Sequence, residues 1–188
     1  MVALGASAGG LNALTRVLSG LPADFPAALV VVQHLDRRHR SLMVEILAKR
    51  TSLEVRQAAE GDELRAGRVV IAPPNHHLLV NAGGRLSLAQ TELVHFVRPS
   101  ADLLFESTAA AYRERAIAVI LSGSGQDGAM GVRAIKKMGG TVIVQDTKNA
   151  EFPGMPEAAL ATGAADFVLA VDEIAPALQR LLASPVTE

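Results

Sequence analysis

Short apolar runs that alternate with helical patterns constrain the fold of this chain more than any other feature. Leu29–Val32 and Ile117–Leu121 contain no polar residue, and Val2–Leu4 is followed by leucines at helical spacing. A strand that is apolar on both faces must be covered on both faces, which is typical of parallel sheets. We therefore predict a doubly wound α/β domain with a mostly parallel sheet and helices on both faces.

An antiparallel β-hairpin is predicted near the middle, because Gly83-Gly84 separates two short alternating segments, His77–Asn81 and Arg85–Ala89. Ser100 is placed to cap a helix that runs to about Arg115. The same patterns predict further strands at 69–72, 141–145 and 166–169, and further helices at 41–50, 127–137 and 172–183.

Composition excludes several classes of protein. The chain has 188 residues, about one domain, and a net charge of −1, which disfavours a nucleic-acid or anionic-lipid partner. Hydrophobic residues make up 49%, too many for a disordered chain. The apolar runs fall short of the ~18 residues that a membrane span needs. With no cysteine, and with strand-like sequence already at Val2, we expect a cytoplasmic protein without a signal peptide or membrane insertion.

The first candidate site residue is Ser7, in the loop Gly5-Ala6-Ser7-Ala8-Gly9-Gly10 between a strand and a helix. The G-x-S-x-G pattern at residues 5–9 is typical of a sharp turn that exposes a nucleophilic hydroxyl next to helix N–H groups. Ser7 stands where a dinucleotide-binding fingerprint would need glycine, and no lysine follows as in a P-loop. From the loop alone, a nucleophile and a generic anion-binding turn remain open.

The second candidate is His34, which ends the second apolar run where a nicotinamide-binding fold usually has an acidic residue. If the first two strands are neighbours, the imidazole lies within reach of Ser7 as a general base. A lone histidine here would more often bond a backbone carbonyl. Beside Ser7, the catalytic interpretation is favoured.

The third candidate is Asp127, in the glycine-rich loop after Leu121. It can orient the histidine as the acid of a triad, or cap the helix predicted to begin there. As a cap, asparagine would serve equally well, whereas in a triad that replacement removes the charge that faces the imidazolium. The chain order Ser, His, Asp differs from that of α/β-hydrolases, chymotrypsin and subtilisin, so none of those folds follows from the motif.

Several spaced motifs recur in one order along nearly the whole chain: Gly5–Gly10, Gln33-His34, Ile71-Ala72-Pro73 with His77, Arg98-Pro99-Ser100 with Asp102, Gly123-x-Gly125-x-Asp127-Gly128 and Gly154-Met155-Pro156. Together they resemble the catalytic domain of the protein-glutamate methylesterase (CheB) family of bacterial chemotaxis.

The resemblance implies hydrolysis of glutamate methyl esters on the cytoplasmic helices of chemoreceptors, with release of methanol, and deamidation of particular receptor glutamines. It implies that Ser7 is the nucleophile, His34 the base and Asp127 the orienting acid, and that no metal or cofactor is needed. Ala8 and Ser124, which would line the oxyanion and substrate region, replace the threonine and methionine common in the family, and Val97 replaces a frequent histidine.

Family members usually carry an N-terminal receiver domain. We expect residues 1–188 to form a single catalytic domain without one, regulated by a receiver domain or a methyltransferase in the full-length protein or in trans. Two other functions remain open: a catalytically idle binding domain of the same fold, and an esterase for small metabolites.

Two other features are weighed as minor candidates. The adjacent histidines His76 and His77 suggest a metal site. Adjacent residues of a strand point to opposite faces, so one metal ion would rarely bind both, and a structural role is favoured. The basic cluster Arg37, Arg38, His39 and Arg40 fits a solvated corner and, less well, an attraction for an acidic receptor surface.

Overall fold

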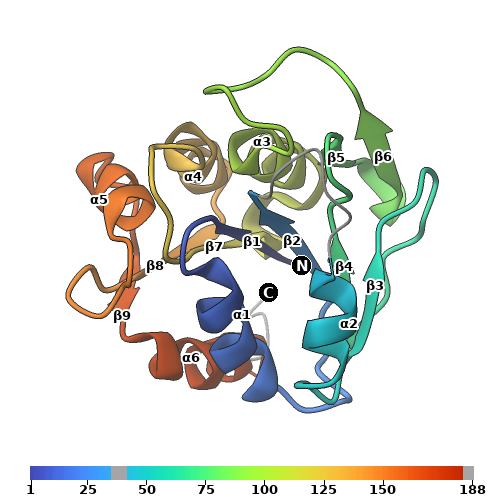
Figure 1. Cartoon of the computed structure of the whole chain (residues 1–188), viewed down its shortest axis with the longest axis horizontal. Coiled ribbons are helices and arrows are strands. Elements are labelled where there is room, and N and C mark those ends of the chain that lie inside the picture. Colours follow the sequence, from blue (N-terminus) through green and yellow to red (C-terminus); the bar gives the residue numbers. More distant parts are fainter. Residues whose placement is uncertain (35–41, 184–188) are drawn as a thin grey trace.

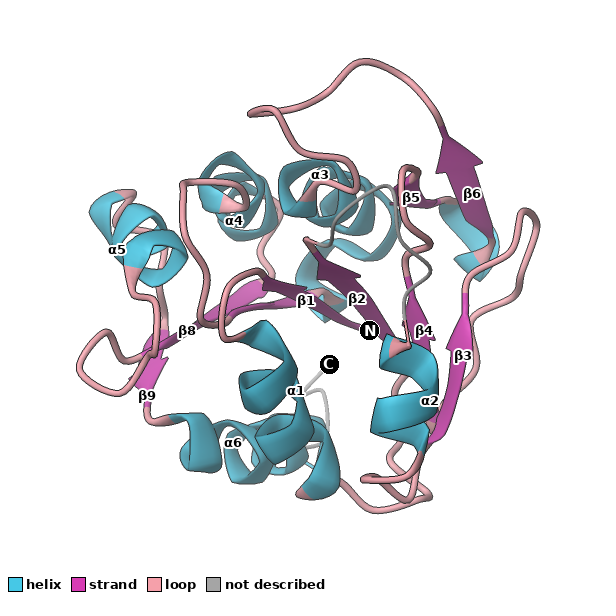
Figure 2. Cartoon of the chain, in the orientation of Figure 1, coloured by secondary structure: helices cyan, strands magenta, loops and turns pink. Residues whose placement is uncertain are grey.

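A computed structural model describes residues 1–34 and 42–183 of the chain. Seven strands form one sheet in the order β3-β4-β2-β1-β7-β8-β9, and every neighbouring pair in it is parallel (Figures 1 and 2). These strands are β1 (Val2–Ala6), β2 (Leu29–Gln33), β3 (Glu54–Gln57), β4 (Arg68–Ile71), β7 (Ile117–Ile120), β8 (Thr141–Gln145) and β9 (Phe167–Leu169).

Helices cover both faces of this sheet, as predicted (Figure 1). On one face lie α1 (Gly10–Ser19), α2 (Met43–Ala48) and α6 (Val171–Ala183); on the other lie α3 (Ala101–Tyr112), α4 (Ala129–Lys137) and α5 (Gly154–Ala161). Alternate residues of each central strand enter the two cores. Leu4 and Val31 pack with α1 and α6, whereas Ala3 and Val30 pack with α3 and α4.

The predicted hairpin is confirmed as a separate antiparallel pair, β5 (His77–Val80) and β6 (Leu86–Ala89). Its apolar face joins the core that α3 occupies, through Leu78, Val80 and Leu86. The Val80 N–H also donates to Ser107 Oγ of α3 at 3.1 Å. A short 3-10 helix, Ala82–Gly84, forms the turn, and another, Arg113–Arg115, follows α3.

Three elements differ from the sequence-based prediction. The helix expected from Asp127 begins at Ala129, because Gly128, with φ 97°, occupies its N-cap position. Edge strand β3 was not predicted, since its four residues are all exposed or half-buried and show no apolar run. Helix α5 was not predicted either: it starts Gly154-Met155-Pro156, and a proline disfavours a helix except in its first turn.

The strand order determines where a site can form. The chain adds β2, β4 and β3 on one side of β1, and β7, β8 and β9 on the other. Connections therefore change direction next to β1, and ligands of open α/β sheets bind beyond the carboxyl ends of the strands at such a point. The loops after β1, β2 and β7 carry Ser7, His34 and Asp127. Within the described residues, no helix is long and apolar enough to cross a membrane.

Candidate active site

Ser7 directly follows β1, and its backbone is held on both sides. Its N–H donates to the Ser122 carbonyl at 3.0 Å, and its own carbonyl accepts from the Gly10 N–H at 2.9 Å and from Gln33 Nε2 at 2.7 Å. Gly9, with φ 71°, adopts the left-handed conformation that lets the loop enter α1. The half-buried Ser7 side chain is therefore presented from a fixed turn.

His34 lies beside Ser7 because β1 and β2 are register partners. Ala6 pairs with Gln33, the His34 N–H donates to the Ala6 carbonyl at 3.1 Å, and Gln33 Nε2 also donates to the His34 carbonyl at 3.0 Å. The side-chain amide of Gln33 thus donates to the carbonyls of both Ser7 and His34, the residues that directly follow β1 and β2. The His34 side chain is 12% exposed.

Asp127 is buried, at 3% exposure, and both of its oxygens accept two hydrogen bonds. Oδ2 accepts from His34 Nε2 at 2.7 Å and from the Ala101 N–H at 2.6 Å. Oδ1 accepts from the Ser100 hydroxyl at 2.8 Å and from the Asp102 N–H at 3.1 Å. The carboxylate therefore joins the imidazole to the N-terminus of α3.

Asp127 both contacts the histidine and caps a helix, but the helix it caps is not the one that follows it. Gly128 caps α4, whereas Asp127 accepts the first two N–H groups of α3. Ser100, predicted to cap α3, does so: its Oγ accepts from the Leu103 N–H at 3.4 Å while its hydroxyl donates to Asp127. With four donors around the carboxylate, we now expect asparagine to replace Asp127 only with a loss of stability.

The environment of Asp127 favours its ionised form. Burial alone would raise its pKa, but the hydrogen bonds from His34, Ala101 and Ser100 and the charge of His34 outweigh burial and hold the pKa below its ordinary value. A helix N-terminus adds to this effect, because its partial positive charge stabilises a carboxylate.

The orientation of the His34 ring follows from this contact. An ionised carboxylate only accepts hydrogen bonds, so Nε2 carries the proton and Nδ1 is the nitrogen that can accept one. In the chymotrypsin arrangement the two ring nitrogens have the opposite roles. The Ser7 hydroxyl makes no hydrogen bond with any described residue, and catalytic hydrogen bonds often form only in the substrate complex.

Ala8 and Ser124, the residues expected in the oxyanion region, lie on two loops that meet at Ser7. A Cβ atom on Gly123 would lie 2.9 Å from Ser7 Cβ and 2.2 Å from Met155 Sδ, so only glycine permits this approach. Within the described part of the chain, neither the Ala8 N–H nor the Ser124 N–H has an acceptor. Two free N–H groups beside a hydroxyl are the donors that an oxyanion requires.

Three residues support this site in a way that the sequence analysis did not predict: Gln33, Ser122 and Gln145. The Ser122 hydroxyl donates to the Ala8 carbonyl at 2.8 Å, and its N–H donates to Gln145 Oε1 at 2.8 Å. Both glutamines are buried at the carboxyl ends of apolar strands. A glutamine at the end of an apolar strand was the sequence signal for this role, because a buried side-chain amide needs hydrogen-bond partners and the backbone of the neighbouring loops provides them.

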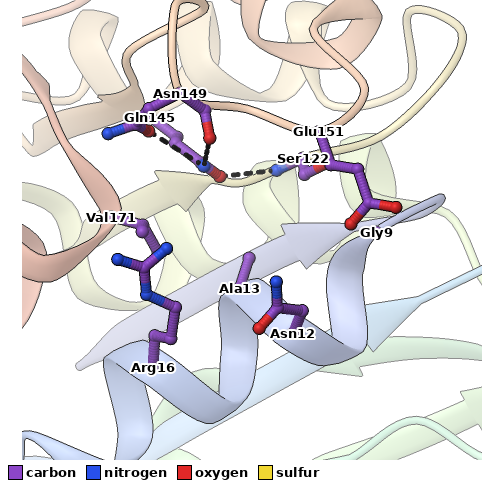
Figure 3. A pocket seen from close by; sticks show the side chains of 9 residues that line it. All are labelled: Gly9, Asn12, Ala13, Arg16, Ser122, Gln145, Asn149, Glu151 and Val171. Carbon is purple, nitrogen blue, oxygen red and sulfur yellow. Dashed lines mark hydrogen bonds between the residues drawn. The ribbon is translucent and has the colours of Figure 1, made fainter.

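Two cavities flank the Ser7 loop. An open cleft of about 380 Å³ is lined by Ser7, Leu11, Gln33 and Arg50 among others, and this volume suits a substrate side chain. A second cavity, between α1 and the loop after β8, measures only about 30 Å³ and has a polar lining that includes Asn12 and Glu151 (Figure 3). It is large enough for about one water molecule.

The histidine pair considered as a metal site does not join this site. His77 is buried and its Nε2 donates to the Glu92 carbonyl at 2.9 Å, while His76 Nδ1 donates to the Pro74 carbonyl at 3.0 Å. Within residues 1–34 and 42–183, no three His, Asp or Glu side chains are grouped so that they could hold a metal ion. The basic cluster at 37–40 lies outside the described residues.

Comparison with known proteins decides the family. The family model of the CheB methylesterase matches residues 2–178. The chain belongs to the CheB methylesterase family. The resemblance drawn from the spaced motifs is confirmed.

Individual relatives agree with this assignment. Proteins named protein-glutamate methylesterase/protein-glutamine glutaminase are 42% identical over 180 residues in Symbiobacterium thermophilum and 47% identical over 182 residues in Anaeromyxobacter dehalogenans. These matches cover 96% of this chain but 50% and 53% of the relatives, so the chain spans about half of their length. A Leptospira interrogans protein, provisionally given the same name, is 39% identical over 180 residues, which are 93% of it.

A solved structure confirms the fold. The crystal structure of the Thermotoga maritima CheB methylesterase catalytic domain superposes with a TM-score of 0.92 at 36% identity and covers 96% of this chain and 97% of that one. The predicted α/β class, with its parallel sheet and added hairpin, is therefore correct for the described residues.

The first prediction concerns Asp127→Asn. The four donors around the carboxylate need two acceptor oxygens, and an amide offers one oxygen and one NH₂ group in either orientation. We expect a loss of about 1–3 kcal/mol in the free energy of unfolding, measured by urea denaturation. If Asp127 orients His34 in ester hydrolysis, the kcat of that reaction should fall by a factor of at least ~10². Exposed Asp24→Asn is the matched control. Unchanged stability would contradict the capping role.

The second prediction concerns pH. A carboxylate whose pKa is lower in the folded state adds stability above its unfolded pKa, and this stability is lost as the pH falls through the folded pKa. The difference in Tm between the wild type and Asp127→Asn should therefore be largest near pH 7 and shrink below about pH 4. Calorimetry at several pH values measures this difference. A difference that stays constant while both proteins remain folded would mean that the charge of Asp127 contributes nothing.

Proposed function

We propose that this chain is a serine hydrolase that removes the methyl ester from glutamate side chains of chemoreceptors and releases methanol. The observation that carries the proposal is the His34–Asp127 hydrogen bond at the ends of the strands that flank Ser7. The names of the relatives, protein-glutamate methylesterase/protein-glutamine glutaminase, support the substrate class.

The proposed chemistry assigns one step to each side chain. His34 Nδ1 accepts the Ser7 hydroxyl proton as Oγ attacks the ester carbonyl, while Asp127 stabilises the imidazolium through Nε2–H. The Ala8 and Ser124 N–H groups donate to the oxyanion of the tetrahedral intermediate. The imidazolium returns the proton to the leaving methoxide, which departs as methanol. Water then attacks the acyl-enzyme by the same route and releases glutamate and the Ser7 hydroxyl.

The same residues account for deamidation. A glutamine side chain in place of the ester gives the same acyl-enzyme, with ammonia as the leaving group in place of methanol. Hydrolysis of that acyl-enzyme yields glutamate. The nitrogen of an amide leaves less readily than the oxygen of a methyl ester. We therefore propose that deamidation depends more strongly than ester hydrolysis on protonation of the leaving group by the His34 imidazolium.

The proposed partner is a cytoplasmic helix of a chemoreceptor, and the open cleft beside Ser7 is the proposed entry for its side chain. We place the reaction in the cytoplasm and assign residues 1–188 to one catalytic domain. A receiver domain or a methyltransferase, in the full-length protein or in trans, is the proposed regulator; the greater length of several relatives is compatible with further domains.

The third prediction tests the nucleophile. Ser7→Ala removes the hydroxyl that we propose forms the acyl-enzyme, so methanol release from a methylated receptor cytoplasmic fragment should fall to background. The substitution should leave the Tm nearly unchanged, because the backbone, not the hydroxyl, holds this loop. Ser19→Ala, at the exposed C-terminal end of α1, is the matched control.

Three outcomes of that assay would contradict the proposal. Methanol release by Ser7→Ala would exclude the covalent mechanism. Wild-type turnover of p-nitrophenyl acetate without methanol release from the receptor fragment would favour an esterase for small metabolites. Binding of the receptor fragment without turnover of either substrate would indicate an idle binding domain.

A further inference from the structure

A second buried carboxylate, Asp102, lies next to Asp127, and the two cap each other's helices. Asp127, which precedes α4, accepts the N–H groups of Ala101 and Asp102 in the first turn of α3. Asp102, on α3, accepts the N–H of Gly131 in the first turn of α4 through Oδ1, at 2.7 Å. Each carboxylate is 3% exposed. The N-termini of α3 and α4 are thus joined by a reciprocal pair of hydrogen-bonded acids.

The backbones at this junction are in direct contact. A Cβ atom on Gly131 would lie 3.0 Å from the Asp102 Cα and carbonyl oxygen and 2.6 Å from Phe105 Cβ. No side chain separates the two first turns. Since Asp127 lies four residues before Gly131, the Asp102–Gly131 hydrogen bond fixes the segment that delivers the orienting acid to His34.

The second oxygen of Asp102 has no hydrogen-bond partner among the described residues. His95 Nε2 lies 3.2 Å from this oxygen, Oδ2, and the two form an ion pair when His95 is protonated. His95 comes from the long loop between β6 and α3 (Figure 1). The other titratable groups that interact with Asp102 are Asp127 and, one turn along α3, Glu106.

These neighbours leave Asp102 as the less strongly stabilised of the two acids. Burial raises the pKa of Asp102; the Gly131 N–H opposes this rise, the charge of Asp127 adds to it and His95 opposes it. Two carboxylates in one buried site disfavour each other's charge. The charge of Asp102 therefore contributes to the electrostatic potential at the His34–Asp127 pair.

We propose that Asp102 is a positioning residue for the catalytic acid: it holds Asp127 in place through the N-terminus of α4, and its charge, partnered by His95, adds to the field that stabilises protonated His34. This inference rests on the proposed function, because the position of Asp127 affects a rate only where Asp127 orients a catalytic histidine. No motif assigns this role to Asp102, which touches neither Ser7 nor His34 through a hydrogen bond.

The fourth prediction separates the two parts of this role with a pair of variants, assayed for kcat and KM of methanol release from the methylated receptor fragment. Asp102→Ala removes the acceptor of the Gly131 N–H, so kcat should fall about tenfold or more with KM nearly unchanged. Asp102→Asn keeps an acceptor oxygen and should recover most of that loss. Because Asn lacks the negative charge, the acid limb of its pH profile for kcat/KM should move to lower pH. Glu106→Gln, one turn along α3, is the matched control and should keep the wild-type kcat.

A purely structural role predicts different results. If Asp102→Ala lowers the Tm but the folded enzyme keeps the wild-type kcat and pH profile, Asp102 only caps α4 and the inference is overturned. If Asp102→Ala does not fold, the pH profile of Asp102→Asn decides, and a profile identical to the wild type overturns the inference.

A readout that needs no turnover separates this inference from the proposed function. The pH titration of the His34 ring, followed by NMR in the wild type and in Asp102→Asn, reports the charge of Asp102 directly. A shift of that titration to lower pH in a protein that hydrolyses no ester would support the role of Asp102 and reject the proposed function. An unchanged titration overturns the inference whatever the activity.

Discussion

The buried carboxylate of Asp127 is the contact on which the geometry of this site depends. An ionised group at 3% exposure is costly unless hydrogen bonds replace its water shell, and four donors do so here. Three of them belong to Ser100 and the first turn of α3. The same hydrogen bonds therefore stabilise both that helix and the ionised form of the acid. The fourth donor is His34, whose tautomer is determined by it. Helix capping and histidine orientation are thus produced by the same two oxygens.

Much of this arrangement could be predicted from the sequence, because it depends on local patterns. The apolar runs predict a parallel sheet, and the glycine loop, the histidine and the aspartate each follow such a run. Parallel strands end at one edge, so three polar side chains after Val2–Leu4, Leu29–Val32 and Ile117–Leu121 were expected to lie together. The strand order and the TM-score of 0.92 to a CheB catalytic domain confirm the parallel sheet, and a hydrogen bond joins two of the three side chains, His34 and Asp127.

The bonding of Asp127 could not be predicted in the same way. An aspartate before a helix is usually read as the cap of that helix, because the motif is local. Here the left-handed Gly128 takes the N-cap position and the carboxylate turns to α3, which begins at residue 101. Only the packing of α3 on α4, which the small size of Gly131 permits, brings those N–H groups within reach. The buried glutamines Gln33 and Gln145 were missed for a similar reason, since their partners are loop carbonyls and N–H groups distant in sequence.

The spacing of the strands explains why the ring nitrogens of His34 have the opposite roles to those in chymotrypsin. Neighbouring strands lie about 4.8 Å apart, so the ends of β2 and β7, with β1 between them, are separated by roughly 10 Å. Nε2 is the ring nitrogen farther from the backbone, and it reaches across β1 to the loop after β7. Nδ1 is the ring nitrogen closer to the His34 backbone, and on the adjacent strand Ser7 follows Ala6, the register partner of Gln33. The proposed base acts through Nδ1 and therefore requires a nucleophile on the neighbouring strand, which is where Ser7 follows β1.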